Sequence, residues 1–413
     1  MSLEALKRVD PELADLLLAE ERRQADTIEL IASENFCPLS IREAVGSVLT
    51  DKYAEGYPAA RWYGGCDVID EVERLAIERG KALFGCEYIN VQPHAGSQAN
   101  MAVYFAALEP GATLLSMDLT HGGHLTHGKK TNFSGRTYTI VHYGVSAKDE
   151  RIDYDALARQ AREVRPAMLV AGASAYPRVI EVDRMAAIAA DCGAKLLVDM
   201  AHFAGLVVGG QHPDPVPVAD FVTGTTHKTM RGPRGGFVIA KAAYGKAIDQ
   251  AIFPGLQGGP LMHVIAGKAA AFALARTDAF REYQARVVAN ARAMADQMGA
   301  LGYRLISGGT DTHLFLVDLG PRRITGAQAQ AWLGQAGIVI NKNVIPFDTR
   351  SPVDPSGIRL GTPAITTRGA DADDVRQVAR WIDRVLAADD PAAVARSLRP
   401  EVLAFCRSHP IPD

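Results

Sequence analysis

The chain has 413 residues, of which 48% are hydrophobic and 22% are charged, and this composition is typical of a globular protein. It excludes a disordered chain and leaves ample apolar surface for a core. Lys and Arg together number 44 against 47 Asp and Glu, so the net charge of −3 excludes a protein built for bulk attraction to nucleic acid or to an anionic membrane. The length favours two domains, or one large domain with an appendage.

The cysteines and the first residues indicate the compartment. The five cysteines are odd in number and include no C-x-x-C pair, so we expect free thiols in a reducing environment instead of disulfides or a zinc ribbon. The N-terminal sequence is acidic and amphipathic, without the apolar segment of a signal peptide. No stretch reaches the length of about 18 consecutive apolar residues that a membrane helix needs. We expect a soluble, cytoplasmic protein that binds neither membrane nor nucleic acid.

The apolar pattern predicts a helical arm followed by a large α/β region. Apolar residues at helical spacing over 3–29 predict the arm. From about 70 to 240, short apolar runs alternate with helix-like stretches, which is typical of β-α-β units on a mostly parallel sheet. The predicted strands are 88–91, 113–117, 168–171, 195–198 and 236–239.

The remaining sequence predicts one long helix and a smaller C-terminal unit. The helix covers 262–298. The strands and final helices predicted after it are 313–317, 338–340, 370–387 and 391–407. We therefore expect a three-part chain, with an N-terminal arm and dimerisation segment, a large domain and a small α+β domain. The parts are 1–40, 41–275 and 276–413.

Three short motifs stand where predicted strands meet helices. Asp199 directly follows an apolar strand, where open α/β sheets bind their ligands, although an Asp there can equally be a helix N-cap. Lys228 lies between threonines and precedes a Gly-rich turn, so it is either a Schiff-base lysine or a surface lysine. Gly96 and Ser97 open a predicted helix whose free amide groups would suit a phosphate.

The order of the three motifs carries more information than any of them alone. A phosphate cup is followed about a hundred residues later by the acid Asp199, and Lys228 follows 29 residues after that. Pyridoxal phosphate (PLP) requires a lysine for its aldehyde, a carboxylate for its ring nitrogen and dipoles for its phosphate. The sequence therefore favours PLP bound on a doubly wound sheet.

Three histidines in seven residues, His121, His124 and His127, raise the alternative of a metal site. Their spacing carries no nearby Cys or carboxylate, and zinc sites usually show other spacings. We expect no metal. A flat imidazole lying over a flat cofactor is the favoured interpretation, with the neighbouring glycines permitting close approach.

The chain resembles serine hydroxymethyltransferase, a PLP-dependent enzyme of the aspartate-aminotransferase fold type. The matching stretches run in the family's order over nearly the whole chain. They are 29–35, 52–58, 63–66, 121–128, 198–202, 225–229, 253–260 and 359–364. The resemblance implies the PLP-dependent transferase fold type I, an α/β fold with a mostly parallel seven-stranded sheet in the large domain.

The resemblance also implies how PLP is held. Lys228 would bind its aldehyde, Asp199 would pair with its ring nitrogen and His124 would stack on its ring. The other implied cofactor contacts are Gly96, Ser97, Ser174 and His202, together with Tyr53, Gly258 and Gly259, which would reach the phosphate of the partner subunit. A homodimer with shared active sites is therefore expected.

Substrate contacts follow from the same resemblance. Arg359 would clamp the substrate carboxylate with its two-pronged guanidinium, assisted by Ser33. Glu55 would act as general base on the substrate hydroxyl, with Tyr63 beside it. Thr226 is counted with the catalytic residues, and Tyr53 and His202 with the substrate contacts. The implied folate contacts are Glu55, Trp62, Leu119, Gly123, Leu125, Asn343 and Phe253.

The implied reaction is reversible transfer of the hydroxymethyl group of L-serine to tetrahydrofolate, which gives glycine and 5,10-methylenetetrahydrofolate. Two positions depart from the family: Ala95 stands where Ser is usual and removes one hydroxyl from the phosphate cup, and Gly224 stands where Thr is usual and leaves an alternative function open. Gly224 is either family drift or a pocket enlarged for an α-methyl group, as in 2-methylserine hydroxymethyltransferases and aldolases, which convert 2-methylserine to D-alanine. A paralogue that keeps the fold without catalysis is a third hypothesis, but Lys228, Asp199 and Arg359 are all retained.

Overall fold

The computed structural model describes residues 3–412, which form two compact units. The larger unit is Ser40–Ala285, and the smaller joins the described residues up to Leu39 to those from Arg286 onward. Helix α12 (Asp278–Ala300) contains the boundary between the two units. Across residues 3–412, every helix is too short or too polar to span a bilayer.

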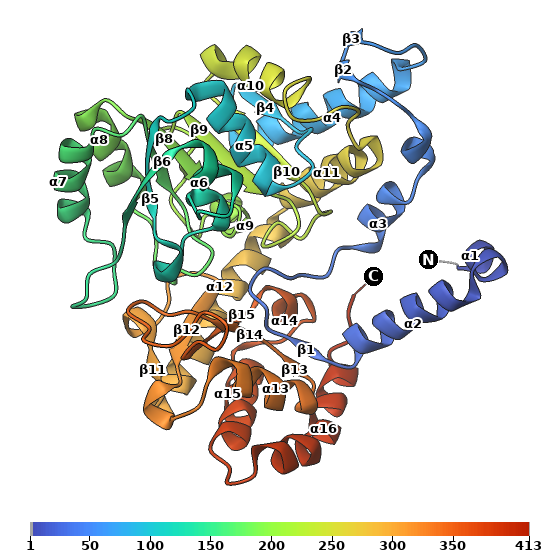
Figure 1. Cartoon of the computed structure of the whole chain (residues 1–413). Helices are drawn as coiled ribbons and strands as arrows, with labels where there is room; N and C mark the ends of the chain where they lie inside the picture. The colour runs from blue at the N-terminus through green and yellow to red at the C-terminus, as the bar shows by residue number, and fades with distance from the viewer. Residues whose placement is uncertain (1–2, 413) are drawn as a thin grey trace. The chain divides into compact units, whose positions relative to one another are not determined.

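A seven-stranded sheet with the order β4-β10-β9-β8-β7-β5-β6 forms the centre of the larger unit (Figure 1). The strands are β4 (Tyr88–Asn90), β5 (Thr113–Met117), β6 (Thr139–Tyr143), β7 (Met168–Ala171), β8 (Lys195–Asp199), β9 (Phe221–Thr225) and β10 (Gly236–Ala240). The strands from β6 to β9 pair in parallel, whereas β10 runs antiparallel to both neighbours. The prediction of a mostly parallel seven-stranded sheet is confirmed.

Five of these strands match the predicted apolar runs, and β6 and β9 were not predicted. Strand β6 lies at an edge of the sheet, and its burial is low and irregular, so it lacks a continuous apolar run. Strand β9 is buried throughout but reads Phe-Val-Thr-Gly-Thr, in which Gly and polar side chains hide the strand pattern. Pairing with neighbouring strands defines both strands more clearly than the apolar pattern of their own sequence does.

Helices cover both faces of this sheet. Helix α5 (Gly96–Ala107) and helix α10 (Gly245–Ile252) pack in one core cluster with side chains such as Phe221 and Val238. On the opposite face, Phe237 packs against aromatic rings of the helices α4 (Asp67–Phe84) and α11 (Met262–Ala275). The other helices of this unit are α6 (Phe133–Thr137), α7 (Tyr154–Val164), α8 (Val182–Cys192) and α9 (Ala204–Val208).

The predicted single helix over 262–298 is wrong, because the chain forms α11 and α12 with a break between them. Thr277 occupies the break, and its hydroxyl accepts a hydrogen bond from the amide of Phe280 at 3.3 Å. Such a side-chain cap satisfies an amide that has no partner within the helix, so Thr277 starts a new helix.

The smaller unit contains the N-terminal arm and an antiparallel sheet with the order β11-β12-β15-β14. The strands are β11 (Arg304–Leu305), β12 (Leu314–Asp318), β14 (Asn341–Asn343) and β15 (Gly357–Gly361), and a separate parallel pair joins β1 (Ile28–Glu29) to β13 (Ile338–Val339). The helices include α13 (Gly326–Ala336), α14 (Pro363–Thr367), α15 (Ala372–Leu386) and α16 (Pro391–Ser408). This α+β unit and its last two helices agree with the sequence prediction.

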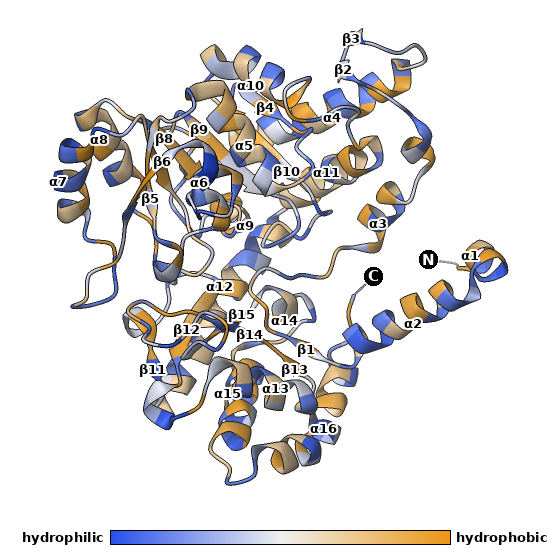
Figure 2. Ribbon diagram, in the orientation of Figure 1, coloured by the Kyte–Doolittle hydropathy of each residue, from blue (hydrophilic) through white to orange (hydrophobic). Residues whose placement is uncertain are grey.

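The arm consists of the helices α1 (Glu4–Val9) and α2 (Pro11–Ala25). Asp10 caps α2 by accepting from the amide of Leu13 at 2.9 Å, and Pro11 fits the first helical position. Hydrophobic and hydrophilic residues alternate along α2 (Figure 2), and Leu13, Leu16 and Leu17 are exposed. The arm therefore presents apolar side chains that its own unit does not bury.

One buried arginine holds the end of the arm. The Arg368 guanidinium donates to backbone carbonyls at the end of α2 and near the end of α16, where a cation also complements the helix dipoles. The carbonyls belong to Gln24, Ala25, Thr27, Cys406 and His409.

Candidate active site

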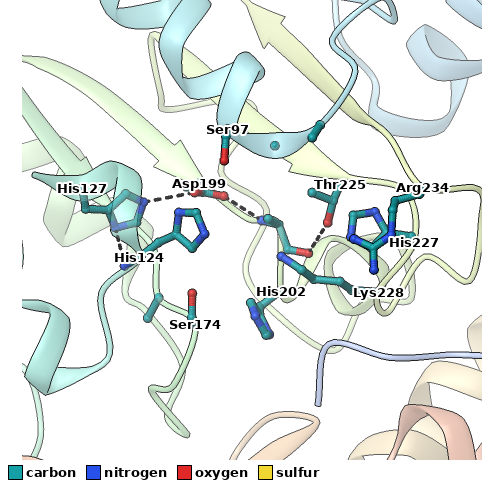
Figure 3. Close-up of a pocket in the computed structure, with 14 residues that line it drawn as sticks. Ser97, His124, His127, Ser174, Asp199, His202, Thr225, His227, Lys228 and Arg234 are labelled. Carbon is teal, nitrogen blue, oxygen red and sulfur yellow. Dashed lines mark hydrogen bonds and ion pairs between the residues drawn. The ribbon is translucent and has the colours of Figure 1, made fainter. Parts of the chain in front are cut away.

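A cavity of about 230 Å³ lies in the larger unit, at the edge of the sheet where the parallel strands end. Asp199 closes β8, α5 begins at Gly96, and Lys228 follows β9 in the chain. Figure 3 shows His124, Ser174, His202 and Lys228 around the same space. The predicted cofactor residues that line this one cavity are Gly96, Ser97, His124, Ser174, Asp199, His202 and Lys228.

Asp199 is a buried carboxylate with three hydrogen-bond contacts. Asn100 Nδ2 donates to Oδ2 at 2.8 Å, the amide of Ala201 donates to Oδ1 at 3.0 Å, and His127 Nε2 lies 3.0 Å from Oδ2. Burial alone would raise the pKa of Asp199, but the hydrogen bond and charge of His127, with the bond from Asn100, hold it well below its usual range. The side chain therefore keeps a negative charge inside the protein, as a protonated ring nitrogen requires.

His127 is the contact that sequence reasoning missed. It is 1% exposed, and it meets Asp199 across 72 residues of sequence, so local spacing could not reveal the carboxylate. His124, His127 and Asp199 are side chains of the types that bind metals. Their potential metal-binding atoms, the imidazole nitrogens and a carboxylate oxygen, lie within 4.8 Å of one another. In the hydrogen-bond network, His127 acts as a positioning residue for Asp199.

His124 presents an uncharged ring to the cavity. Burial lowers the pKa of His124 to about 4, and electrostatic interactions with His127 and Lys228 act in the same direction, whereas Asp199 acts against them. Its Nδ1 lies 2.7 Å from the hydroxyl of Thr126, which fixes the orientation of the ring. A neutral imidazole can stack on a cationic pyridinium ring without charge repulsion.

The start of α5 has the form of an anion cup. No side chain of the described residues 3–412 caps this helix at Ala95, so the first amide groups remain available to an anion. A Cβ atom on Gly96 would lie 2.8 Å from Thr225 Cγ2, and Gly96 therefore lets the helix start approach β9 closely. The missing hydroxyl at Ala95 leaves these backbone donors in place.

The segment that carries Lys228 is held by its backbone. The hydroxyl of Thr226 donates to the carbonyl of Pro233 at 2.5 Å, and the amide of Gly232 donates to the carbonyl of Thr226 at 2.6 Å. Thr226 is fully buried, and it is not one of the residues that line the cavity. Its contacts shape the loop, and its predicted catalytic role stays a prediction.

A second group of predicted residues gathers in the same unit, outside the residues that line the cavity. The rings of Tyr53 and Tyr63 meet edge to face at 5.1 Å, and the carboxylate of Glu55 raises the pKa of Tyr63. A Cβ atom on Gly258 would lie 3.1 Å from Glu55 Oε1, and one on Gly259 would lie 3.3 Å from Tyr53 Cζ. We call these five residues the Glu55 cluster; Tyr53 and Tyr63 are exposed.

The predicted folate residues belong to several elements of both units. Trp62 is 76% exposed on the hairpin next to Glu55, and its amide donates to the Glu55 carbonyl at 3.0 Å. Leu119 and Leu125 are exposed residues of two short 3₁₀ helices. The remaining predicted folate residues are Gly123, which packs on the Met117 carbonyl, Phe253 at the end of α10, and Asn343 in the smaller unit.

The two residues predicted to bind the substrate carboxylate, Arg359 and Ser33, belong to the smaller unit. Arg359 lies in β15 with its Nε 3.1 Å from Asn341 Oδ1, and burial lowers its pKa to about 10, so it stays charged at neutral pH. The segment before Ser33 runs beside β15, because the amide of Gly361 donates to the carbonyl of Leu30 at 2.8 Å.

The hypothesis that Gly224 enlarges the cavity is wrong. Successive side chains of β9 point to opposite faces, and Thr225 lines the cavity, so position 224 faces the other way. A Cβ atom on Gly224 would lie 2.3 Å from Cζ of Phe237, which packs with Phe84 and Phe272. Gly224 makes room for the core ring of Phe237.

We expect Gly224→Ala to lower the free energy of unfolding by about 1–3 kcal/mol, the usual cost of overpacking a core. Urea denaturation measures this effect. Gly334→Ala is the matched control, because among the described residues no atom beyond its chain neighbours and its own helix backbone lies within 4 Å of a Cβ atom there, and alanine favours its helix. A selective loss of one amino-acid substrate in Gly224→Ala, without loss of stability, would contradict the structure.

The cavity residues fit PLP by their chemistry, since a buried carboxylate, an uncharged ring, an uncapped helix start and a lysine meet at one edge of the sheet. Fold and site together define a PLP-dependent enzyme of fold type I. The family model of serine hydroxymethyltransferase matches residues 6–382 of the 413, and the chain belongs to this family. The family consists of PLP-dependent one-carbon transferases that use tetrahydrofolate as co-substrate.

Proposed function

We propose that the protein is a serine hydroxymethyltransferase that converts L-serine and tetrahydrofolate reversibly to glycine and 5,10-methylenetetrahydrofolate. The family match over 6–382, with Lys228 and the Asp199–His127 pair lining one cavity, is the observation that carries the proposal. The retained Lys228, Asp199 and Arg359 argue against a non-catalytic paralogue. We also infer that the reaction takes place in the cytoplasm, in keeping with the free cysteines.

The residues of the cavity would hold PLP, which when bound supplies an electron sink for negative charge at the substrate Cα. Lys228 would anchor the cofactor covalently, and Asp199 would hold the proton on its ring nitrogen. Gly96 and Ser97 would bind the phosphate, Ser174 and His202 the ring hydroxyl, and His124 would cover the ring. The roles of Asp199, Gly96 and Ser97 are supported by the contacts of Asp199 and by the uncapped start of α5, and those of the other residues by their place in the cavity lining and by the family match.

The substrate roles follow from charge. Arg359 binds the carboxylate of the amino acid through two parallel N–H donors, with Ser33 assisting. Glu55 takes the proton of the serine hydroxyl, and Tyr63, whose pKa its carboxylate raises, lies beside it with its ring against that of Tyr53. The folate is bound by Trp62, Leu119, Gly123, Leu125, Asn343 and Phe253.

We propose further that two copies of the chain share their active sites. Within one protomer, the Glu55 cluster and the cavity are separate sets of residues, and the tyrosines of the cluster are exposed. A homodimer in which Tyr53, Gly258, Gly259 and Phe253 of one protomer serve the other would complete both sites. The exposed leucines of α2 offer apolar surface for such an interface.

Steady-state kinetics with L-serine and 2-methylserine, each with and without tetrahydrofolate, test the proposal. We expect glycine formation from L-serine that depends on tetrahydrofolate. Since Gly224 faces Phe237, it no longer supports the 2-methylserine alternative. Faster formation of D-alanine from 2-methylserine than of glycine from L-serine would overturn the proposed substrate.

A further inference from the structure

The hairpin that carries Glu55 is fixed from inside by Arg61. The hairpin joins β2 (Gly56–Tyr57) to β3 (Ala60–Arg61), and the Arg61 side chain is 3% exposed. Its Nη1 donates to the carbonyls of Ala54 and Gly56 at 3.0 and 2.9 Å. These two carbonyls lie on either side of Glu55 in the chain, so the guanidinium sets the backbone from which the proposed base projects.

A buried carboxylate and an amide extend this contact toward the phosphate cup. Arg61 Nη2 donates to Glu73 Oε2 at 2.6 Å, and Gln92 Nε2 donates both to Glu73 Oε1 at 2.8 Å and to the carbonyl of Gly56 at 3.0 Å. Glu73 and Gln92 are 1% and 2% exposed. Gln92 lies four residues before Gly96, between the end of β4 and the start of α5.

A second amide ties the glycine pair of the Glu55 cluster to the same segment. Gln257 Nε2 donates to the carbonyl of Gln92 at 3.0 Å, and Gln257 Oε1 accepts from the amide of His94 at 3.0 Å. Gln257 directly precedes Gly258 and Gly259. The chain from 92 to 94 is therefore bound on one side by a residue adjacent to the glycine pair.

The other side of the segment is bound by a lysine. Lys268 is 1% exposed, and its Nζ donates to the carbonyls of Val91, Pro93 and Gly236 at 2.6, 3.0 and 2.8 Å. Gly236 begins β10, directly after the loop that carries Lys228. Burial lowers the pKa of Lys268 to about 7, and its protonated form directs all three of its donors at these carbonyls, which ties the start of the phosphate cup to the end of the lysine loop.

We propose that Arg61, Glu73, Gln92, Gln257 and Lys268 form a buried polar hub that positions the phosphate cup and the Glu55 hairpin as one rigid element. The hub residues are not among the residues that line the cavity, so they act as positioning residues. The inference rests on the proposed function for its catalytic meaning, because it assigns the cup to PLP and Glu55 to the substrate hydroxyl. Its structural content, the mechanical link between 54–62 and 93–99, can be tested without any assay of turnover.

Gln92→Leu is the sharpest test. Leucine fills a similar volume and keeps the main-chain bonds of Gln92, but it leaves Glu73 Oε1 without this donor inside the protein. In the holoenzyme, we expect amide hydrogen exchange to rise about tenfold in both 54–62 and 93–99. The dissociation constant for PLP should rise about tenfold as well, while that for pyridoxal, which lacks the phosphate, stays within about twofold.

Two further variants make the result decisive. Arg61→Lys keeps the charge but loses the fork, and Arg61 makes its contacts in the hairpin and with acidic side chains. Increased amide exchange at 93–99 in Arg61→Lys would show that a change in the hairpin reaches the phosphate cup through the hub. The same variant replaces Gln92→Leu as the test if Gln92→Leu does not fold. Tyr143→Phe is the control, because it removes one buried hydrogen bond to the Val170 carbonyl elsewhere in this unit.

Three outcomes would overturn the inference. Exchange that rises in only one of the two segments would show that they are positioned independently. Equal loss of PLP and pyridoxal binding, or the same changes in Tyr143→Phe, would show a general loss of stability. Absence of tetrahydrofolate-dependent turnover in the unsubstituted enzyme would refute the proposed function instead and would leave the exchange result to judge the hub.

Discussion

Lys228→Ala is expected to abolish turnover and to leave PLP loosely held. Lys228 lines the cavity that Asp199 and His124 also line, and it follows β9 on a loop fixed by the bonds of Thr226. A covalent lysine both anchors PLP and exchanges it with the incoming amino acid, and alanine can do neither. We expect kcat/KM to fall on the order of 10⁴-fold or more, the scale seen when a covalent nucleophile is removed.

The measurement combines turnover with cofactor retention. After dialysis, Lys228→Ala should lose the visible absorbance of bound PLP, whereas Lys241→Ala should retain both this absorbance and its activity. Lys241 is an exposed lysine of the same unit that pairs with Asp220 at 2.6 Å, so its loss removes only a surface contact. Full activity of Lys228→Ala would refute the assignment of the anchor.

Arg359→Lys is expected to weaken amino-acid binding far more than cofactor binding. A lysine keeps the positive charge, but it cannot donate two parallel hydrogen bonds to one carboxylate. The lost bond is to a charged group and is worth about 1.5–3 kcal/mol, so KM for L-serine should rise about 10- to 150-fold. The hydrogen bond from Arg359 Nε to Asn341 would also be lost, which removes a contact that orients the side chain.

Titrations with L-serine and with PLP separate the two effects. The PLP dissociation constant of Arg359→Lys should match that of the unsubstituted enzyme. Arg350→Lys is the control in the same unit, because Arg350 is an exposed arginine paired with Asp354 at 3.0 Å. An unchanged KM for L-serine in Arg359→Lys would mean that another residue binds the carboxylate.

The sequence predicted those parts of the fold that depend on local pattern. The runs at 113–117 and 168–171 are strands at the predicted bounds, because short runs made mostly of apolar side chains need burial on both faces of a parallel sheet. The three cofactor motifs also lie near the element ends that the sequence predicted, with Asp199 at the end of β8, Lys228 in the loop after β9 and Gly96 at the start of α5. The cavity gathers them because parallel strands end at the same edge.

What the sequence did not predict depends on contacts between distant residues. His127 meets Asp199 across 72 residues, and no spacing rule links the two. Gly224 lies opposite Phe237 in the pairing of β9 and β10, so only the register shows that its missing side chain leaves room for a core ring. The break at Thr277 is a local cap that the apolar pattern on either side concealed.

Reduction of the holoenzyme with borohydride, followed by peptide mapping, tests most directly whether the cavity beside Asp199 holds PLP. Borohydride fixes the cofactor irreversibly on the amine that binds its aldehyde, so the labelled peptide identifies that residue. We predict a single label, on the peptide that contains Lys228. A label on any other lysine, or a protein that retains no cofactor to reduce, would contradict this assignment of the active site.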